Sequence, residues 1–379
     1  MVKYINMRNL FKDYIYPIAV FSGGMVGVGF LALPYIAMKT GIWIMLGYFL
    51  ILTALIIAID LIFAEISLKT PDFKRFPGFV GHYLGKYAKT FALISTIFGT
   101  LGVLLAYLIV GSNFLTSALQ PFLHGNIFTY TLIYFLIAGT ILYFDIKIVS
   151  KIEFWVLILL FLSLFFIFMQ GFPQIKLSNI FIGNWKLEIG NLFLPYGALL
   201  FSLWGIGLIP ETEEMIRGKK NKLKKIIIIS TLIVSFFYLL FVFLILGISG
   251  ASTTQTAIDG LRRFFGGGIL SVALLAGALA TLTAFIAQGT ILKKVLIYDL
   301  KIKHWQAFVM TCFTPLILLL LGFNSFIPLI SFIGGVLLGI DGILILFMYK
   351  KTGGKNIIIY PLSLVFLLGL IYEIIYFIK

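Results

Sequence analysis

The chain has 379 residues, of which 61% are hydrophobic and 11% are charged, and its mean hydropathy is +1.10. A soluble globular domain, in which about a quarter of the residues are charged, is therefore excluded. The 39 Phe and 37 Gly residues are typical of packed membrane helices, where Gly lets backbones approach and aromatic rings fill the remaining space. The formal net charge of +15 then raises the question of which side of a bilayer the basic residues occupy.

A transmembrane helix needs about 20 apolar residues, and eleven stretches of the chain meet this requirement. Basic residues precede the first stretch without a small-residue cleavage site, so we expect an uncleaved first helix. The sequence therefore predicts an all-α integral membrane protein with about 11 transmembrane helices. In chain order they cover residues 14–38, 41–67, 89–119, 127–145, 150–171, 192–212, 226–248, 267–292, 304–322, 326–349 and 356–377.

The distribution of Lys and Arg predicts the orientation of these helices. With the amino terminus inside, the segments on the inner face are 1–13, 68–88, 146–151, 213–225, 293–303 and 350–355. Of the 29 Lys and Arg residues, the outer side then holds only Lys39, Lys176, Lys186, Arg262, Arg263 and Lys379. Such an imbalance on alternate loops favours a multi-pass protein of the plasma membrane with a cytoplasmic amino terminus and an outer carboxyl terminus.

The strongest basic cluster runs from Arg217 to Lys225, on a predicted inner loop. Clusters of this kind next to a membrane helix bind anionic lipid headgroups. Because the topology already accounts for these charges, we expect the inner leaflet as the partner and no nucleic acid.

Two of the predicted helices share a motif that is unusual for a membrane span. Each carries Phe-Ser, then Gly-aliphatic-Gly, then Pro, and the two helices are five apart in the chain. Because five is odd, the second copy enters the membrane from the opposite face, as an inverted repeat requires. The two copies are Phe21-Ser22, Gly27-Val28-Gly29 and Pro34, and Phe201-Ser202, Gly205-Ile206-Gly207 and Pro210.

Gly weakens a membrane helix and Pro removes a backbone donor, so both motifs predict helices that are broken inside the membrane. Unwound backbone is tolerated there only where protein or a water-filled cavity satisfies it, as in the binding sites of secondary transporters. We expect a single transporter domain over 1–379, with inverted repeats at 14–171 and 192–349 and an extra helix at 356–377. Close helix packing at small residues is the other use of such glycines.

The run from Gly27 to Tyr35, followed by Lys39-Thr40-Gly41, and the run from Phe201 to Glu214 resemble the amino acid/auxin permease family and the related aromatic amino acid permeases. Both belong to the amino acid-polyamine-organocation superfamily. The resemblance implies the LeuT-type fold, with two inverted five-helix repeats, and coupled transport of amino acids by alternating access.

The same resemblance implies where an amino acid would bind. Its carboxylate would lie against Gly27, Val28 and Gly29, and its ammonium group near the carbonyls between Ser202 and Gly205. Aromatic side chains would cover or line the substrate, which we expect to be a free and neutral amino acid. These side chains are Phe201, Trp204 and Tyr107.

Two coupling ions, sodium and the proton, are possible from the sequence. Sodium is expected, because in sodium-coupled relatives hydroxyls of the eighth helix join carbonyls of the first, which here means Thr281 and Thr283 with Gly24 and Gly27. A Thr hydroxyl can equally bond back to its own helix. Proton coupling needs a buried titratable group, and intramembrane carboxylates are the candidates. Those that could couple or gate are Asp60, Glu65, Asp341 and Glu211, and the first three could instead pair with inner-loop bases.

An enzyme is not expected, because the three histidines are dispersed and neither His-Glu-x-x-His nor Gly-x-Ser-x-Gly occurs. We expect no tightly bound cofactor. An amino acid sensor built on the transporter fold and an exchanger without ion coupling remain alternatives, because both would use the same pocket.

Overall fold

The computed structural model describes residues 11–71, 74–120, 122–144, 149–181, 192–216, 220–258, 260–261, 264–265 and 267–378. In these residues every regular element is a helix. The first half contains η1 (Phe11–Ile15), α2 (Tyr16–Met25), η2 (Gly29–Ala32), α3 (Leu33–Thr40), α4 (Ile42–Lys69), α5 (Phe76–Leu84), α6 (Lys86–Leu119), α7 (Ile127–Tyr143), α8 (Val149–Gly171), η3 (Phe172–Gln174) and α9 (Leu177–Ile180). The second half contains α11 (Leu194–Leu203), η4 (Ile206–Leu208), α12 (Ile209–Met215), α13 (Lys220–Ser249), η5 (Gly250–Ser252), α14 (Gly267–Tyr298), α15 (His304–Leu320), α16 (Phe326–Phe332), η7 (Ile333–Leu338), α17 (Gly339–Lys351) and α18 (Asn356–Ile378).

Each of the predicted apolar stretches coincides with one helix or with several consecutive helical segments. Among the described residues, 7 helices are long and apolar enough to cross a membrane, and the bent pair Asp13–Met25 and Gly29–Thr40 raises this to 8. Three further apolar helices are shorter: Ile127–Tyr143, Ile158–Gln174 and His304–Leu320. The all-helical membrane fold is therefore confirmed, whereas eleven spans and the inverted repeats remain predictions.

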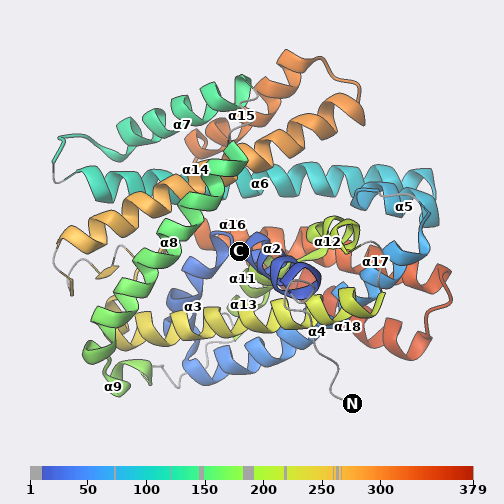
Figure 1. Cartoon of the computed structure of the whole chain (residues 1–379), viewed down its shortest axis with the longest axis horizontal. Helices are drawn as coiled ribbons and strands as arrows, with labels where there is room; N and C mark the ends of the chain where they lie inside the picture. The colour runs from blue at the N-terminus through green and yellow to red at the C-terminus, as the bar shows by residue number, and fades with distance from the viewer. Residues whose placement is uncertain are drawn as a thin grey trace.

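The helices form two groups that lie side by side (Figure 1). In the first group, α6, α7, α14 and α15 pack on one another, and they occupy the upper part of the view. In the second, α13 packs on α2, α3 and α4, and α11 packs on α3 and α4. Both broken helices thus belong to the second group. The long α8 crosses obliquely and packs mainly on α14.

The last helices close the second group. The π-helix η7 packs on α11, and α18 packs on both η7 and α17. The first half of the sixth predicted span is therefore held between the first helices of the chain and the last ones. Helix α11 therefore contacts α18 both directly and through η7.

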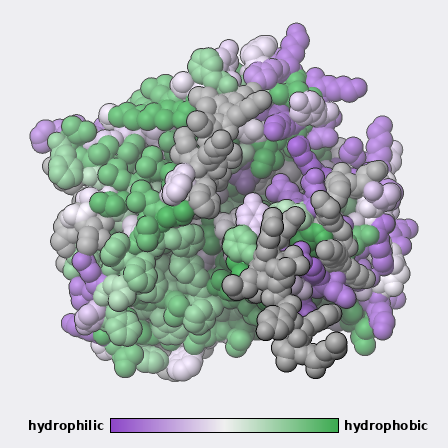
Figure 2. Space-filling view, in the orientation of Figure 1, coloured by the Kyte–Doolittle hydropathy of each residue, from purple (hydrophilic) through white to green (hydrophobic). Residues whose placement is uncertain are grey.

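The surface has the polarity that a bilayer requires. Large apolar side chains such as Leu50, Phe98 and Ile357 are exposed by 76%, 62% and 80%, which in water would be unfavourable over so wide an area. Figure 2 shows hydrophobic residues over the centre and left of this face, and hydrophilic ones gathered along the right edge. That edge is where α5 and the connection from α17 to α18 lie in Figure 1, both of which are predicted to be inside.

Candidate functional site

The first predicted span is interrupted at its Gly-rich motif. Helix α2 ends at Met25, Val26 is extended (φ −76°, ψ 92°), and a new helical run starts at Gly29 with a bend of 56°. Pro34 is the second residue of α3, where its missing N–H leaves no acceptor unsatisfied. The Gly and Pro pattern therefore produces the predicted break.

The sixth predicted span is interrupted in the same way. Helix α11 ends at Leu203, and Trp204 is extended (φ −70°, ψ 110°). After Gly205 the chain forms the short 3₁₀-helix η4 and then α12, with Pro210 as its second residue. Both breaks thus share one order: α-helix, extended residue, 3₁₀-helix, and an α-helix with Pro in its first turn.

The two breaks face each other, and glycine makes the approach possible. A Cβ atom on Gly29 would lie 2.7 Å from Cδ1 of Phe201 and closer still to Oγ of Ser202. A Cβ atom on Gly205 would lie 3.0 Å from Cζ of Phe21. Phe201 and Ser202 therefore pack on Gly29 of the first motif, and Phe21 packs on Gly205 of the second, so the structure brings the two predicted halves of the site together.

A tyrosine that sequence reasoning missed links the two breaks. The hydroxyl of Tyr238, on α13, lies 3.1 Å from the carbonyl oxygen of Met25 and 3.2 Å from that of Ser202, and it donates to these acceptors. Its ring is fully buried and stacks on Phe30, with centroids 5.3 Å apart. No sequence signal distinguishes Tyr238 from the rest of the 18 Tyr residues.

We expect Tyr238→Phe to slow uptake several-fold and to lower the stability of the closed arrangement by about 1 kcal/mol, because two carbonyls at the breaks lose a shared donor. Initial uptake rates and thermal unfolding of the purified protein measure the two effects. Tyr130→Phe is the matched control, since the Tyr130 hydroxyl also donates to a backbone carbonyl, that of Leu123 at 2.7 Å. Equal effects of the two variants would contradict a special role for Tyr238.

The other predicted substrate residues surround the same place. Tyr107 comes from α6, in the other helix group, and its hydroxyl would lie 3.5 Å from a Cβ atom on Gly27. Val28 is buried, whereas Phe201 and Trp204 are half-buried. The site is therefore bounded by both breaks on one side and by α6 on the other.

Asp60 lies beside the second break. Its side chain is fully buried, and Oδ2 would lie 3.1 Å from a Cβ atom on Gly205. Within the described part of the chain, neither carboxyl oxygen has a hydrogen-bond partner. Of the pairings with inner-loop bases that the sequence allowed, the structure therefore shows none for Asp60.

Two of the remaining candidate carboxylates have polar partners. Glu65 pairs with Lys69, 3.0 Å away, a base of the predicted inner segment 68–88, and Asp341 accepts a hydrogen bond of 3.1 Å from Ser95. Glu211 is exposed. Its neighbour Glu213 is buried instead and accepts a hydrogen bond from Ser67.

The expected sodium ligands contact different parts of the molecule. Thr281 and Thr283 donate to carbonyls of their own helix, those of Ala278 and Ala280, at 2.9 and 3.0 Å. Oγ1 of Thr281 would lie 2.6 Å from a Cβ atom on Gly111, in α6, whereas a Cβ atom on Gly24 would meet Leu208. The hydroxyls bond locally, and sodium binding here remains a prediction.

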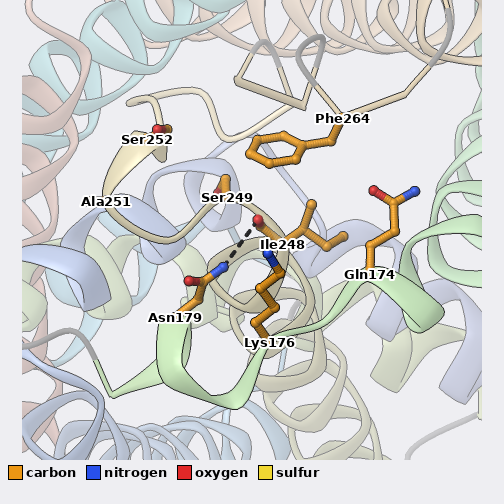
Figure 3. Close-up of a pocket in the computed structure, with 8 residues that line it drawn as sticks. All are labelled: Gln174, Lys176, Asn179, Ile248, Ser249, Ala251, Ser252 and Phe264. Carbon is orange, nitrogen blue, oxygen red and sulfur yellow. Dashed lines mark hydrogen bonds between the residues drawn. The ribbon is translucent and has the colours of Figure 1, made fainter.

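A separate cavity of about 520 Å³ lies near the end of the molecule predicted to face outside (Figure 3). In the close-up, the amide of Asn179 donates to the carbonyl of Ile248. The segment between the predicted helices 226–248 and 267–292 contributes to this cavity, but its charged residues Asp259, Arg262 and Arg263 lie outside the described residues. Its lining residues are Gln174, Lys176, Asn179, Ile248, Ser249, Ala251, Ser252 and Phe264.

Three comparisons place the chain among known proteins. The sequence model of the tryptophan/tyrosine permease family matches residues 12–362. No curated protein matches the chain. Among solved structures, a manganese transporter of Eremococcus coleocola, in complex with an aromatic bis-isothiourea substituted compound, has a TM-score of 0.69 at 14% identity, covering 100% of this chain and 88% of that one.

A second solved structure is MhsT in complex with L-phenylalanine. It has a TM-score of 0.52 at 14% identity and covers 96% of this chain and 97% of that one. At such low identity, these two likenesses establish the fold alone, and they confirm the predicted LeuT-type architecture.

Proposed function

The chain belongs to the tryptophan/tyrosine permease family, and from this premise we propose that it carries a free, neutral, aromatic amino acid across the plasma membrane by ion-coupled alternating access. Family membership makes it a multi-pass membrane transporter of amino acids and not an enzyme. It supports the resemblance to the aromatic amino acid permeases, whereas the resemblance to the amino acid/auxin permease family remains untested. The proposal adds the substrate class, the site and the coupling.

The observation that carries the proposal is the meeting of the two breaks. Gly29 packs against Phe201 and Ser202, while Gly205 packs against Phe21. Unwound backbone of this kind is stable inside a membrane only next to protein or a cavity that satisfies it. A polar ligand bound there would provide such partners in the substrate-bound state.

The polarity of the helix ends suits an amino acid. The helical run that starts at Gly29 presents N–H groups without intrahelical acceptors, which favour a carboxylate. Helix α11 ends at Leu203 with carbonyls that lack intrahelical donors, which favour an ammonium group. The aromatic surfaces of Tyr107, Phe201 and Trp204 would then contact the side chain. The phenylalanine in the complex of MhsT supports an aromatic substrate.

For the coupling ion we propose a proton carried by Asp60. A buried carboxyl group that has no hydrogen-bond partner among the described residues, next to an unwound segment, can bind and release a proton as the segment moves, and intramembrane acids of this kind mark proton relays. Sodium, held by Gly24, Gly27, Thr281 and Thr283, is the alternative. Each Thr hydroxyl that donates to its own helix keeps lone pairs for a cation.

Uptake of labelled amino acids into proteoliposomes tests the function. We expect accumulation of tryptophan, tyrosine or phenylalanine under a pH gradient, and equal accumulation by Thr281→Ala and Thr283→Ala. Accumulation that needs a sodium gradient and is lost in a threonine variant would contradict proton coupling and favour the sodium site.

Exchange of external for internal amino acid without net accumulation would show that the protein is an exchanger and not a symporter. Binding without movement under either gradient would favour the sensor. Right-side-out vesicles with a protease site in the amino-terminal segment would test its predicted cytoplasmic position.

A further inference from the structure

A second buried carboxyl group lies far from the substrate site along the chain, at the junction of α11, η7 and α18. Glu373 is 2% exposed and is the sole acid of the last predicted span. Sequence reasoning missed it, although a lone acid in an apolar span is the signal that should have identified it. The end of α18 to which it belongs is predicted to be the outer end.

Three glycines form the junction around this side chain. A Cβ atom on Gly335 would collide with Cγ of Glu373, and one on Gly197 would lie 2.6 Å from its Oε1. A Cβ atom on Gly369, one turn before Glu373, would collide with the ring of Tyr196. The side chain of Glu373 therefore fills a space that α11 and η7 leave only because they carry glycine, while Gly369 lets α18 approach Tyr196 of α11.

Among the described residues, the groups that face Glu373 are polar and include no base. Tyr48 from α4, Tyr196 from α11, and Tyr372 and Tyr376 from α18 lie within electrostatic reach of its carboxyl group. From the α16 side, the carbonyl of Ser331 lies against the same glycine, Gly197, as Oε1 does. Within the described residues, Oε1 has no hydrogen-bond partner, and the backbone N–H of Gly197, in the first turn of α11, lies against the carboxyl group.

A carboxylate without a cationic partner is costly to bury. It must be neutralised by a cation or by a proton. The close contacts at Gly197, Gly335 and Gly369 do not provide the six or so oxygen ligands that a metal cation usually takes, whereas a proton needs one nearby acceptor. The carbonyl of Ser331 is such an acceptor.

We propose that Glu373 is a proton-binding site that latches the outer half of the sixth span. With a proton bound, its side chain fits the glycine junction and holds α18 against α11 and η7. When the proton is lost, the charged carboxylate favours the arrangement in which water reaches the junction, so α11 separates from α18 and the outer side opens. The latch does not depend on the identity of the substrate or of the coupling ion.

Infrared difference spectra between acid and alkaline pH test proton binding directly, on the purified protein in lipid. We expect a protonated-carboxyl band in the wild type that is retained in Asp60→Asn and missing in Glu373→Gln, which keeps the volume but cannot ionise. Identical bands in the wild type and in Glu373→Gln, or no band that titrates, would overturn the proposal.

Thiol labelling tests the movement without requiring transport and without altering Glu373. In a Cys312→Ala background, Leu200→Cys places a probe at a fully buried position of α11, and Ser252→Cys provides an exposed reference. If the open state has a tenfold lower proton affinity, the ratio of their labelling rates rises up to about tenfold from acid to alkaline pH.

In the same experiment, Glu373→Gln should keep this ratio low and independent of pH. A flat ratio in the protein with native Glu373, or the same rise in Glu373→Gln, would overturn the latch. Because neither measurement uses a substrate, a failure of the proposed transport function would leave both results interpretable.

Discussion

Replacing Gly29 by Val is expected to abolish amino acid uptake while the protein still inserts into the membrane. A Cβ atom on Gly29 would collide with Oγ of Ser202 and lie 2.7 Å from the ring of Phe201, so the two breaks must separate. Overpacking of this kind costs about 1 to 3 kcal/mol, and the displaced backbone no longer presents its N–H groups to a carboxylate. We expect initial uptake to fall at least about 100-fold, since a displacement of about 1 Å at a binding site has that effect.

Two matched glycines provide the controls. A Cβ atom on Gly207, the second glycine of the other motif, meets nothing within 4 Å, so Gly207→Ala should transport nearly normally. A Cβ atom on Gly27 meets only the hydroxyl of Tyr107, at 3.5 Å, so Gly27→Ala should fold but raise KM about tenfold, or about 1.4 kcal/mol, by occupying the carboxylate's approach. Wild-type uptake by a folded Gly29→Val protein would contradict the site assignment.

Asp60→Asn is expected to eliminate accumulation driven by a pH gradient while preserving exchange of amino acid across the membrane. The amide has nearly the volume of the carboxyl group, so the packing against Gly205 is kept, but it cannot carry a proton. For the wild type, coupled to one proton, a gradient of one pH unit supports about tenfold accumulation, equivalent to about 1.4 kcal/mol. The variant should equilibrate substrate without concentrating it.

Asp341→Asn is the matched control for Asp60→Asn. Both acids are buried, but Asp341 accepts a hydrogen bond from Ser95, whereas Asp60 has no such partner in the described residues. Accumulation and counterflow measured on both variants separate the two roles. Normal accumulation by Asp60→Asn, with loss in Asp341→Asn, would transfer the coupling role to α17.

Several features of this protein were predictable because they depend on short-range properties of the chain. The apolar stretches correspond to helices because a bilayer requires about 20 apolar residues with satisfied backbones. The breaks after Met25 and Leu203 follow from Gly and Pro in two spans, since these residues weaken a helix wherever they stand. The repeated motif predicted an inverted repeat, and the family resemblance implied that the two breaks belong to one site.

The neighbours of individual side chains were not predictable in the same way. A helix that is apolar on every side carries no periodicity to tell which face is buried in protein, so the sequence placed Asp60, Thr281 and Glu373 in spans without assigning their contacts. Thr281 is an example, because the sequence does not specify that its hydroxyl donates to its own helix and lies against α6.

The sequence by itself determined the class of protein, the helical segments and the two interrupted spans, because composition and backbone propensity act locally. Only the tertiary structure decided that Tyr238 joins the two breaks, that Asp60 lies against Gly205, and that Glu373 fills the junction of α11 and α18. These contacts join residues from distant helices, and such contacts depend on how whole helices pack, which no single stretch of sequence specifies.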